Sequence, residues 1–170
     1  MIIKLVETSV TLNPYEPRPR PRMTRRVLRG FNPQSFAAAR HRRGISVSDL
    51  ARAADISAAT IFNWEAAKGT PQVDLLARVM KVLDTPIVDV IDISGDQRYP
   101  GDWRITKGMT QPELAAAAQI PTTTLKGIER ADANLSEANA AKLAAALGIT
   151  AEEYRAAYQR ARQRPAGTTA

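Results

Sequence analysis

Residues 44–65 read GISVSDLARAADISAATIFNWE, and residues 108–129 read GMTQPELAAAAQIPTTTLKGIE. The two stretches align at an offset of 64 residues without a gap, and the alignment continues through Leu83 and Leu147. The matching pairs include Leu50 with Leu114, Ala51 with Ala115, Ile56 with Ile120, Thr60 with Thr124, and Glu65 with Glu129. Chance matching in an alanine-rich chain does not explain why the identities fall on structurally demanding positions. We therefore interpret the chain as a duplicated helical unit.

Each copy carries the signals of short helices joined by tight turns. Ser46 with Asp49, and Thr110 with Glu113, have the spacing of a capping box at a helix start. Ser57 is a suitable N-cap for the next helix. The apolar residues expected to face inward are Ile56, Ile61, Trp64, Val73, Leu76, Val79 and Leu83 in the first copy, and Ile120, Ile128, Leu143 and Leu147 in the second. We predict an all-α fold of two bundles, each with about four or five short helices.

The rest of the chain divides around the two copies. Residues 14–22 read PYEPRPRPR, which favours extended polyproline conformations and offers nothing to bury. A short strand within residues 2–12 is optional. The expected organisation is a flexible Pro/Arg-rich arm at 1–30, a first domain at 31–93, a linker at 94–101, a second domain with a C-terminal helix at 102–163 and a disordered tail at 164–170.

The chain is basic, and its charge is unevenly distributed. Its 24 lysines and arginines exceed its 17 acidic residues, which gives a formal net charge of +7. Residues 1–43 carry ten basic and two acidic side chains, residues 44–96 carry four and eight, and residues 97–170 carry ten and seven. A strongly positive net charge indicates nucleic acid as the first candidate for a binding partner and an anionic membrane as the second. Most of the excess belongs to the N-terminal segment.

The composition excludes several classes of function. With no cysteine and a single histidine, His41, the chain cannot form disulfides or thiolate metal sites and lacks the ligands of most zinc sites and of a Ser-His-Asp triad. It also has no phosphate-binding loop, so we expect no enzyme, no metal and no cofactor. Aromatic residues, at 5%, are too few for a surface that stacks single-stranded nucleic acid. No segment approaches the roughly 20 apolar residues of a membrane span, so we expect no membrane partner and a location in the bacterial cytosol or nucleoid.

A helix, a tight turn and a second helix at this spacing form a helix-turn-helix. Both copies resemble the phage-repressor-like (XRE/Cro-type) family of transcriptional regulators. The resemblance rests on Arg40, Gly44, Leu50-Ala51, Ile56-Ser57, Thr60-Ile61, Trp64-Glu65 and Pro71 in the first copy, and on residues 110–115 and 146–148 in the second. It covers residues 31–92 and 102–158 and implies two tandem bundles of the lambda-repressor-like type. The family commonly pairs an arginine of the first helix with the glutamate that closes the recognition helix, which implies the structural pairs Arg40–Glu65 and Arg104–Glu129.

The resemblance also implies which residues meet double-stranded DNA, since the recognition helix of such a fold enters the major groove. The expected base-reading residues are Ser57, Ala58, Ala59, Phe62 and Asn63 in the first unit, and Thr122, Thr123 and Lys126 in the second. The expected backbone contacts are Arg42, Arg43, Ser46, Lys68, Gln111 and Arg130. The expected minor-groove or phosphate contacts of the arm are Arg18, Arg20, Arg22, Arg25, Arg26 and Arg29.

The sequence departs from the family pattern at several positions. In the first unit Val47 replaces the usual Gln, and Asp55 replaces the turn Gly, which is tolerable because Asp accepts a left-handed backbone. In the second unit Pro121 replaces the Ser cap, and Pro100 leaves little room for a full first helix. Gly127 lies inside the expected recognition helix, at a cost of about 1 kcal/mol relative to Ala. These departures favour the second unit as the one that has drifted toward an interaction role.

We predict a sequence-specific DNA-binding transcriptional regulator, a repressor of a phage, mobile-element or bacterial promoter. Two unlike units in one chain could bind an asymmetric site as a monomer, whereas a second unit that dimerises would place the first on a palindrome. Both arrangements stay open. The competing hypothesis is a protein-interaction regulator, an antitoxin or anti-activator, whose second unit binds a regulatory protein partner or forms a homodimer.

Overall fold

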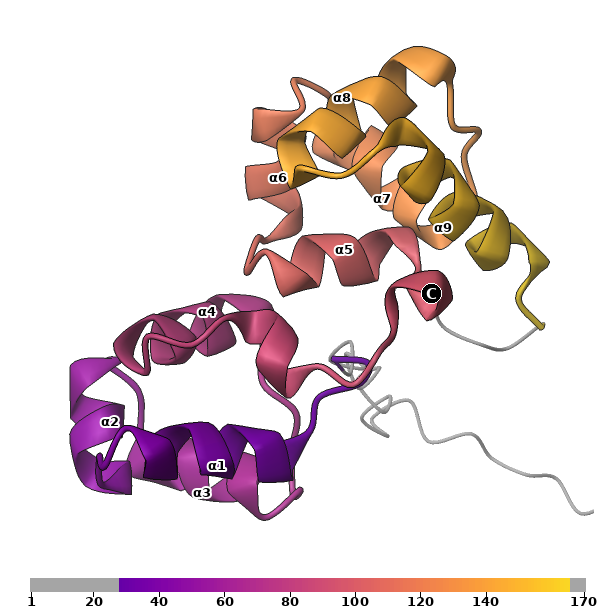
Figure 1. The fold of residues 1–170 in the computed structure, drawn as a ribbon. Helices are drawn as coiled ribbons and strands as arrows, with labels where there is room; N and C mark the ends of the chain where they lie inside the picture. The colour runs from indigo at the N-terminus through magenta and orange to yellow at the C-terminus, as the bar shows by residue number, and fades with distance from the viewer. Residues whose placement is uncertain (1–27, 166–170) are drawn as a thin grey trace, which may run out of the picture.

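The computed structural model describes residues 28–165. Over that range the chain forms nine α-helices and two short 3-10 helices, and its only β pairing is an isolated bridge between Phe31 and Ile91. The helices form two bundles that follow one another along the chain (Figure 1). This confirms the predicted all-α fold. The optional strand at residues 2–12 lies outside the described residues.

The first unit is a bundle of four α-helices closed by a 3-10 helix. Its elements are α1 (Pro33–Arg42), α2 (Val47–Ala53), α3 (Ala58–Glu65), α4 (Val73–Val82) and η1 (Ile87–Val90). The side chains of Ser46 and Ser57 accept the N–H groups of Asp49 and Thr60, which satisfies backbone donors at the starts of α2 and α3. The Phe36 and Trp64 rings meet edge to face at 5.7 Å in the core. The core therefore joins α1 directly to α3.

The second unit repeats this plan and ends in a longer helix. A short η2 (Gly95–Gln97) leads to α5 (Pro100–Thr106), α6 (Gln111–Ala117), α7 (Thr122–Arg130), α8 (Glu137–Leu147) and α9 (Ala151–Gln163). Leu114, Leu125, Ile128 and Leu143 are fully buried in its core. Tyr154 of α9 is fully buried with them, and its burial raises the pKa of its hydroxyl. The last helix thus completes the second core.

In the second unit, capping boxes hold the starts of α6 and α9. The Thr110 hydroxyl and backbone N–H both donate to one carboxylate oxygen of Glu113, at 2.7 and 2.6 Å. Thr150 and Glu153 form the same arrangement at the start of α9. These donors hold the pKa of each glutamate below its usual range, because they stabilise the ionised form. The starts of α6 and α9 are therefore marked by residues that lie only three positions apart in the sequence.

The duplication is visible in the backbone as well as in the sequence. Five residues of the first unit have a positive φ, and all of them except Gly30 have a counterpart with positive φ 64 residues later. The pairs are Gly44 (64°) with Gly108 (68°), Asp55 (53°) with Gln119 (52°), Ala67 (55°) with Ala131 (59°), and Asp84 (51°) with Gly148 (67°). Left-handed backbone is unusual outside glycine, so this agreement shows that the two units share one set of turns. Asp55 adopts the left-handed conformation expected of the residue that replaces the turn glycine.

The structure corrects two of the expected boundaries. Leu28 is buried in the first core, and the backbone N–H of Asp92 donates to the carbonyl of Gly30, so residues 28–30 belong to the fold and not to an arm. The segment expected as a linker at 94–101 contains η2 and the first residues of α5. Proline favours the first turn of a helix because its missing N–H is not needed there, and α5 begins at Pro100. With seven residues against ten in α1, α5 is the shorter first helix.

Candidate nucleic-acid interface

In each unit an ion pair connects the first helix to the end of the third. Arg40 of α1 donates through Nε and Nη2 to the two carboxylate oxygens of Glu65, at 2.7 and 3.1 Å. Its Nη1 also donates to the carbonyl of Ile45, in the turn before α2. One arginine therefore fixes α1, the turn and α3 relative to one another. Such bidentate contacts are directional as well as strong.

The equivalent pair in the second unit is more deeply buried. Arg104 donates to Glu129 at 2.6 and 3.3 Å and to the carbonyl of Met109 at 2.7 Å. The side chain of Glu129 is 0% exposed and that of Arg104 is 6%, against 16% for Glu65 and 11% for Arg40. A carboxylate without access to water requires several donors, since no solvent compensates its charge.

Gln111, one of the expected DNA-backbone contacts, supplies one of these donors. Its side-chain amide donates to Glu129 Oε2 at 2.6 Å. The first unit has Val47 at the equivalent position, which cannot donate a side-chain hydrogen bond. Its carboxylate, Glu65, is more exposed and is paired with Arg40. The amide of Gln111 therefore serves the buried carboxylate of its own unit.

Helix α3 presents its expected base-reading residues on an outward face. Phe62 is 57% exposed, and Asn63, Ala59 and Ser57 are exposed with it. Ala58 is half-buried and packs partly against the first core, so it contributes less to this face than expected. Ile61 and Trp64, one residue before and after the outward pair, are buried. We name Ala59, Phe62 and Asn63 the α3 face.

Helix α7 presents a different surface. Thr123, Lys126 and Arg130 are exposed, while Thr122 is half-buried. Gly127, at the position of Asn63, is half-buried beneath the loop that follows α7, and its carbonyl accepts the backbone N–H groups of Asp132 and Ala133. We name Thr123, Lys126 and Arg130 the α7 face. It is basic where the α3 face is uncharged.

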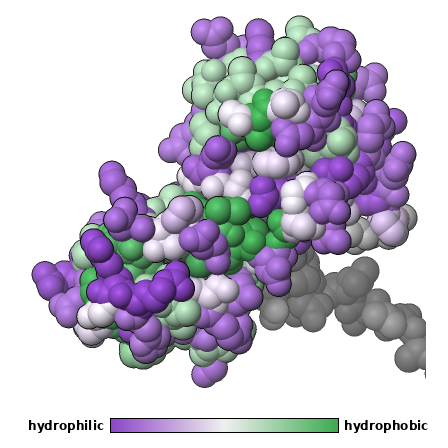
Figure 2. Space-filling model, in the orientation of Figure 1, coloured by the Kyte–Doolittle hydropathy of each residue, from purple (hydrophilic) through white to green (hydrophobic). Residues whose placement is uncertain are grey.

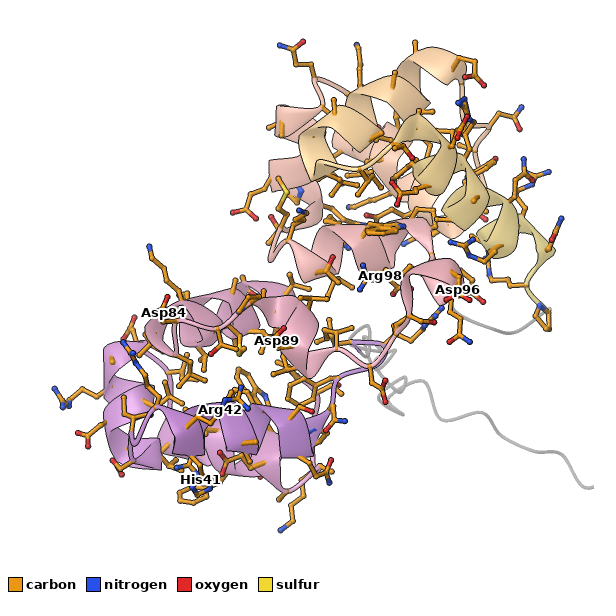
Figure 3. All side chains as sticks on the ribbon, viewed as in Figure 1. His41, Arg42, Asp84, Asp89, Asp96 and Arg98 are labelled. Atoms are coloured by element: carbon orange, nitrogen blue, oxygen red, sulfur yellow. The ribbon has the colours of Figure 1, made fainter. Side chains whose placement is uncertain are left out.

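The remaining expected contacts lie on other parts of the described chain. Figure 3 shows His41 and Arg42 on the last turn of α1, where they are exposed together with Arg43. Lys68, in the loop after α3, is exposed, and so is Ser46, whose hydroxyl caps α2. Cations at a helix C-terminus are favoured by its dipole whether or not they contact phosphate.

Of the six arginines expected to act in the arm, five lie outside the described residues: Arg18, Arg20, Arg22, Arg25 and Arg26. The sixth, Arg29, lies within the described residues and makes contacts inside the protein. Its guanidinium carbon lies 4.1 Å from the centre of the Tyr99 ring, and its Nη2 donates to the carbonyl of Gln97 at 2.9 Å. Arg29 therefore binds the segment between the units, because Leu28 beside it is buried and holds this part of the chain on the fold.

Gly127 replaced by alanine is expected to destabilise the second unit by about 1–3 kcal/mol, although alanine is the better helix former. A Cβ atom at Gly127 would lie 2.8 Å from the Cβ of Ala133, so the loop would have to move. Urea unfolding of the variant measures the change.

Gly69→Ala is the matched control, since a Cβ there meets nothing within 4 Å. Adding Ala133→Gly to Gly127→Ala should restore most of the lost stability. A more stable Gly127→Ala protein would contradict the packing interpretation.

The described residues show neither a metal site nor a membrane span. Within residues 28–165, histidine and acidic side chains form no cluster that could hold a metal ion. No helix in that range is both long enough and apolar enough to cross a membrane.

Comparison with known families identifies both units. The profile described as helix-turn-helix matches residues 36–90 and, separately, residues 102–154. No curated protein matches the chain. The two matches cover most of the described chain and coincide with the two bundles. The chain therefore belongs to the helix-turn-helix family of the phage-repressor-like (XRE) type, the DNA-binding transcription regulators, and carries two tandem copies of the domain.

Proposed function

We propose that the chain is a sequence-specific repressor that reads double-stranded DNA through the α3 face, with the α7 face as a second contact. One observation carries the proposal: Phe62 is 57% exposed beside the exposed Asn63, on a helix that an ion pair holds in place. Among the described residues only Phe62 and Val88 are large, exposed hydrophobic side chains. A large apolar side chain exposed to water marks a contact surface, and on a recognition helix the contact made by Phe62 would be with a DNA base.

The chemistry of the α3 face suits an A·T pair. An asparagine can bond adenine through N6 and N7, and an aromatic or methyl side chain can contact the thymine methyl group. Ala59 and Phe62 supply the apolar contacts, and Asn63 supplies the polar one. The small side chain at Ala59 also lets the helix approach the floor of the groove.

Phosphate contacts must come from positions outside the uncharged α3 face. Basic side chains are scarce around it, because residues 44–96 carry twice as many acidic as basic side chains. We assign this role to Arg42 and Arg43 at the end of α1 and to Lys68, which are all exposed. The basic residues of the arm (Arg18, Arg20, Arg22, Arg25 and Arg26) are proposed as further contacts on the basis of their charge. Each neutralised phosphate adds about −0.9 to the slope of log affinity against log salt.

A protein-interaction role for the second unit remains the second candidate. It is favoured by Gly127, which leaves α7 without a side chain at the position of Asn63. In that case the α7 face would bind a regulatory protein or a second copy of the chain. The two roles differ in whether Lys126 affects the DNA sequence that is bound.

Selection of bound duplexes from a random-sequence library tests the proposal. The native chain is expected to enrich a defined sequence, and Asn63→Ala is expected to relax the preference at one base pair. Asn134→Ala, at another exposed asparagine, is the control and should leave the selected sequence unchanged.

Lys126→Ala decides the role of the second unit. A changed base preference supports DNA reading by α7, and an unchanged one supports the protein-interaction role. A native protein that enriches no sequence would overturn the proposed function.

A further inference from the structure

The two units meet through a set of polar contacts around the segment 95–102, here named the joint. Arg29, which precedes α1, stacks on Tyr99 and bonds the carbonyl of Gln97. The same guanidinium lies 3.5 Å from the carboxylate of Asp102, whose side chain is 5% exposed. One residue of the first unit therefore contacts the connecting segment and the first turn of α5 at once.

A second arginine holds the joint from the other side. Arg160 of α9 donates through Nε and Nη2 to the carbonyl of Arg98, at 3.1 and 2.8 Å, and its Nη2 lies 3.5 Å from the carbonyl of Gly95. The Arg98 guanidinium lies 4.6 Å from the centre of the Trp103 ring. Figure 3 shows Arg98 between the two bundles. Side chains from both units therefore form hydrogen bonds with the joint.

Apolar packing completes the contact between the units. Gly108, in the turn after α5, is so close to the first unit that a Cβ there would lie 2.9 Å from Ile87 Cδ1 and 3.1 Å from the Cβ of Ala77. Ile105 packs against the first core. Figure 2 shows apolar surface gathered where the two units meet. Gly44, the equivalent of Gly108, has nothing within 4 Å, so only the second copy of this turn is used for docking.

The two faces held together by this joint differ in chemistry. Phe62 and Asn63 correspond to Lys126 and Gly127 in the repeat. Apolar side chains and asparagine favour thymine and adenine, whereas lysine and arginine favour the O6 and N7 acceptors of guanine. The two faces therefore present side chains that suit different bases.

We propose that the joint holds the α3 and α7 faces at one separation, so that a single chain recognises a non-palindromic site of two unlike elements, one with an A·T pair and one with a guanine. This inference rests on the proposed function. The spacing of the elements matters because each added base pair shifts the second one by about 3.4 Å and rotates it by about a tenth of a turn. Arg29 and Arg160 are positioning residues for this spacing and contact no base.

The first test measures the separation of the units without DNA. Because the chain has no cysteine, Arg52→Cys with Lys142→Cys introduces two unique sites for spin labels, both exposed and one in each unit. The otherwise native protein is expected to give one narrow distance distribution. Arg29→Ala with Arg160→Ala should broaden it, with helix content unchanged by circular dichroism. Arg155→Ala is the control, because Arg155 lies on the same helix as Arg160 and its ion pair is with the exposed Glu137 of its own unit. An equally narrow distribution in the double variant would overturn the role of the joint.

The second test selects duplexes from a random library with the native chain and with the Arg29→Ala, Arg160→Ala protein. The native chain is expected to enrich two different elements at one separation. The double variant should enrich the same elements at several separations, with its preference for the native spacing reduced on the order of tenfold or more.

The outcomes of the selection separate the two proposals. No enrichment by the native chain would overturn the proposed function. Enrichment of a single element, of a palindrome, or of two elements at variable separations would overturn this inference and leave the proposed function standing.

Discussion

Replacing Glu129 by alanine is expected to lower the free energy of unfolding of the second unit by about 3–5 kcal/mol, the cost of leaving a buried charge without its partner. Arg104 is 6% exposed and donates two hydrogen bonds to Glu129, so the variant leaves a guanidinium where water does not compensate it. Gln111 loses an acceptor at the same time. Urea unfolding followed by circular dichroism measures the loss.

Glu65→Ala is the matched comparison, because it removes the equivalent carboxylate from the first unit. Its loss should be smaller, since Arg40 and Glu65 are 11% and 16% exposed and water can partly replace the missing partner. Equal losses for the two variants, or a loss below about 1 kcal/mol for Glu129→Ala, would contradict the importance assigned to burial.

Asn63→Ala is expected to weaken binding to the selected duplex by about 1–3 kcal/mol, which is on the order of five- to 150-fold in Kd. The variant removes the amide that would bond an adenine edge, and it leaves every positive charge of the protein in place. Binding to unrelated duplex DNA should therefore change little, because nonspecific affinity depends on phosphate contacts. Fluorescence anisotropy with selected and scrambled duplexes measures both affinities.

Asn134→Ala controls for the loss of an exposed amide elsewhere on the surface. Equal weakening of selected and scrambled duplexes by Asn63→Ala would indicate a general binding defect. No weakening of either would remove Asn63 from the interface.

Much of the fold could be predicted because it depends on spacing within single units. The repeat at 64 residues and the all-α fold are confirmed, and the family assignment follows from the same residues. The spacing of 25 residues between Arg40 and Glu65 connects two helices of one bundle, and the structure brings them together. Helix starts such as that of α6 depend on residues only three positions apart. Such short-range patterns are visible in a sequence.

The joint could not be predicted, because its contacts connect distant segments. Arg29 lies 68 residues from Gln97, and Arg160 lies 62 residues from Arg98. In the sequence Arg29 looks like one more charge of the basic arm. The packing of Leu28 into the first core and the contacts of Arg29 with Tyr99 and Gln97 fix where that arginine lies.

The hydrogen bond from Gln111 to Glu129 was not predicted, for a related reason. Gln111 was expected to contact the DNA backbone, whereas the complete burial of Glu129, which its amide bonds, depends on the tertiary structure. One signal was available in the sequence. The first unit has Val47 at this position, so the side chain there cannot make the same contacts in the two copies. Differences between the copies of a repeat therefore indicate where their packing or contacts differ.

The most direct test of base reading by α3 is a double-mutant cycle between Asn63 and single atoms of the selected duplex. Each adenine is replaced in turn by 7-deazaadenine, which lacks the N7 acceptor of the major groove, and Kd is measured for the native chain and for Asn63→Ala. We predict that at one adenine the 7-deaza replacement weakens binding by the native chain but does not weaken binding by the Asn63→Ala variant. Additive losses at every adenine would contradict base reading by Asn63.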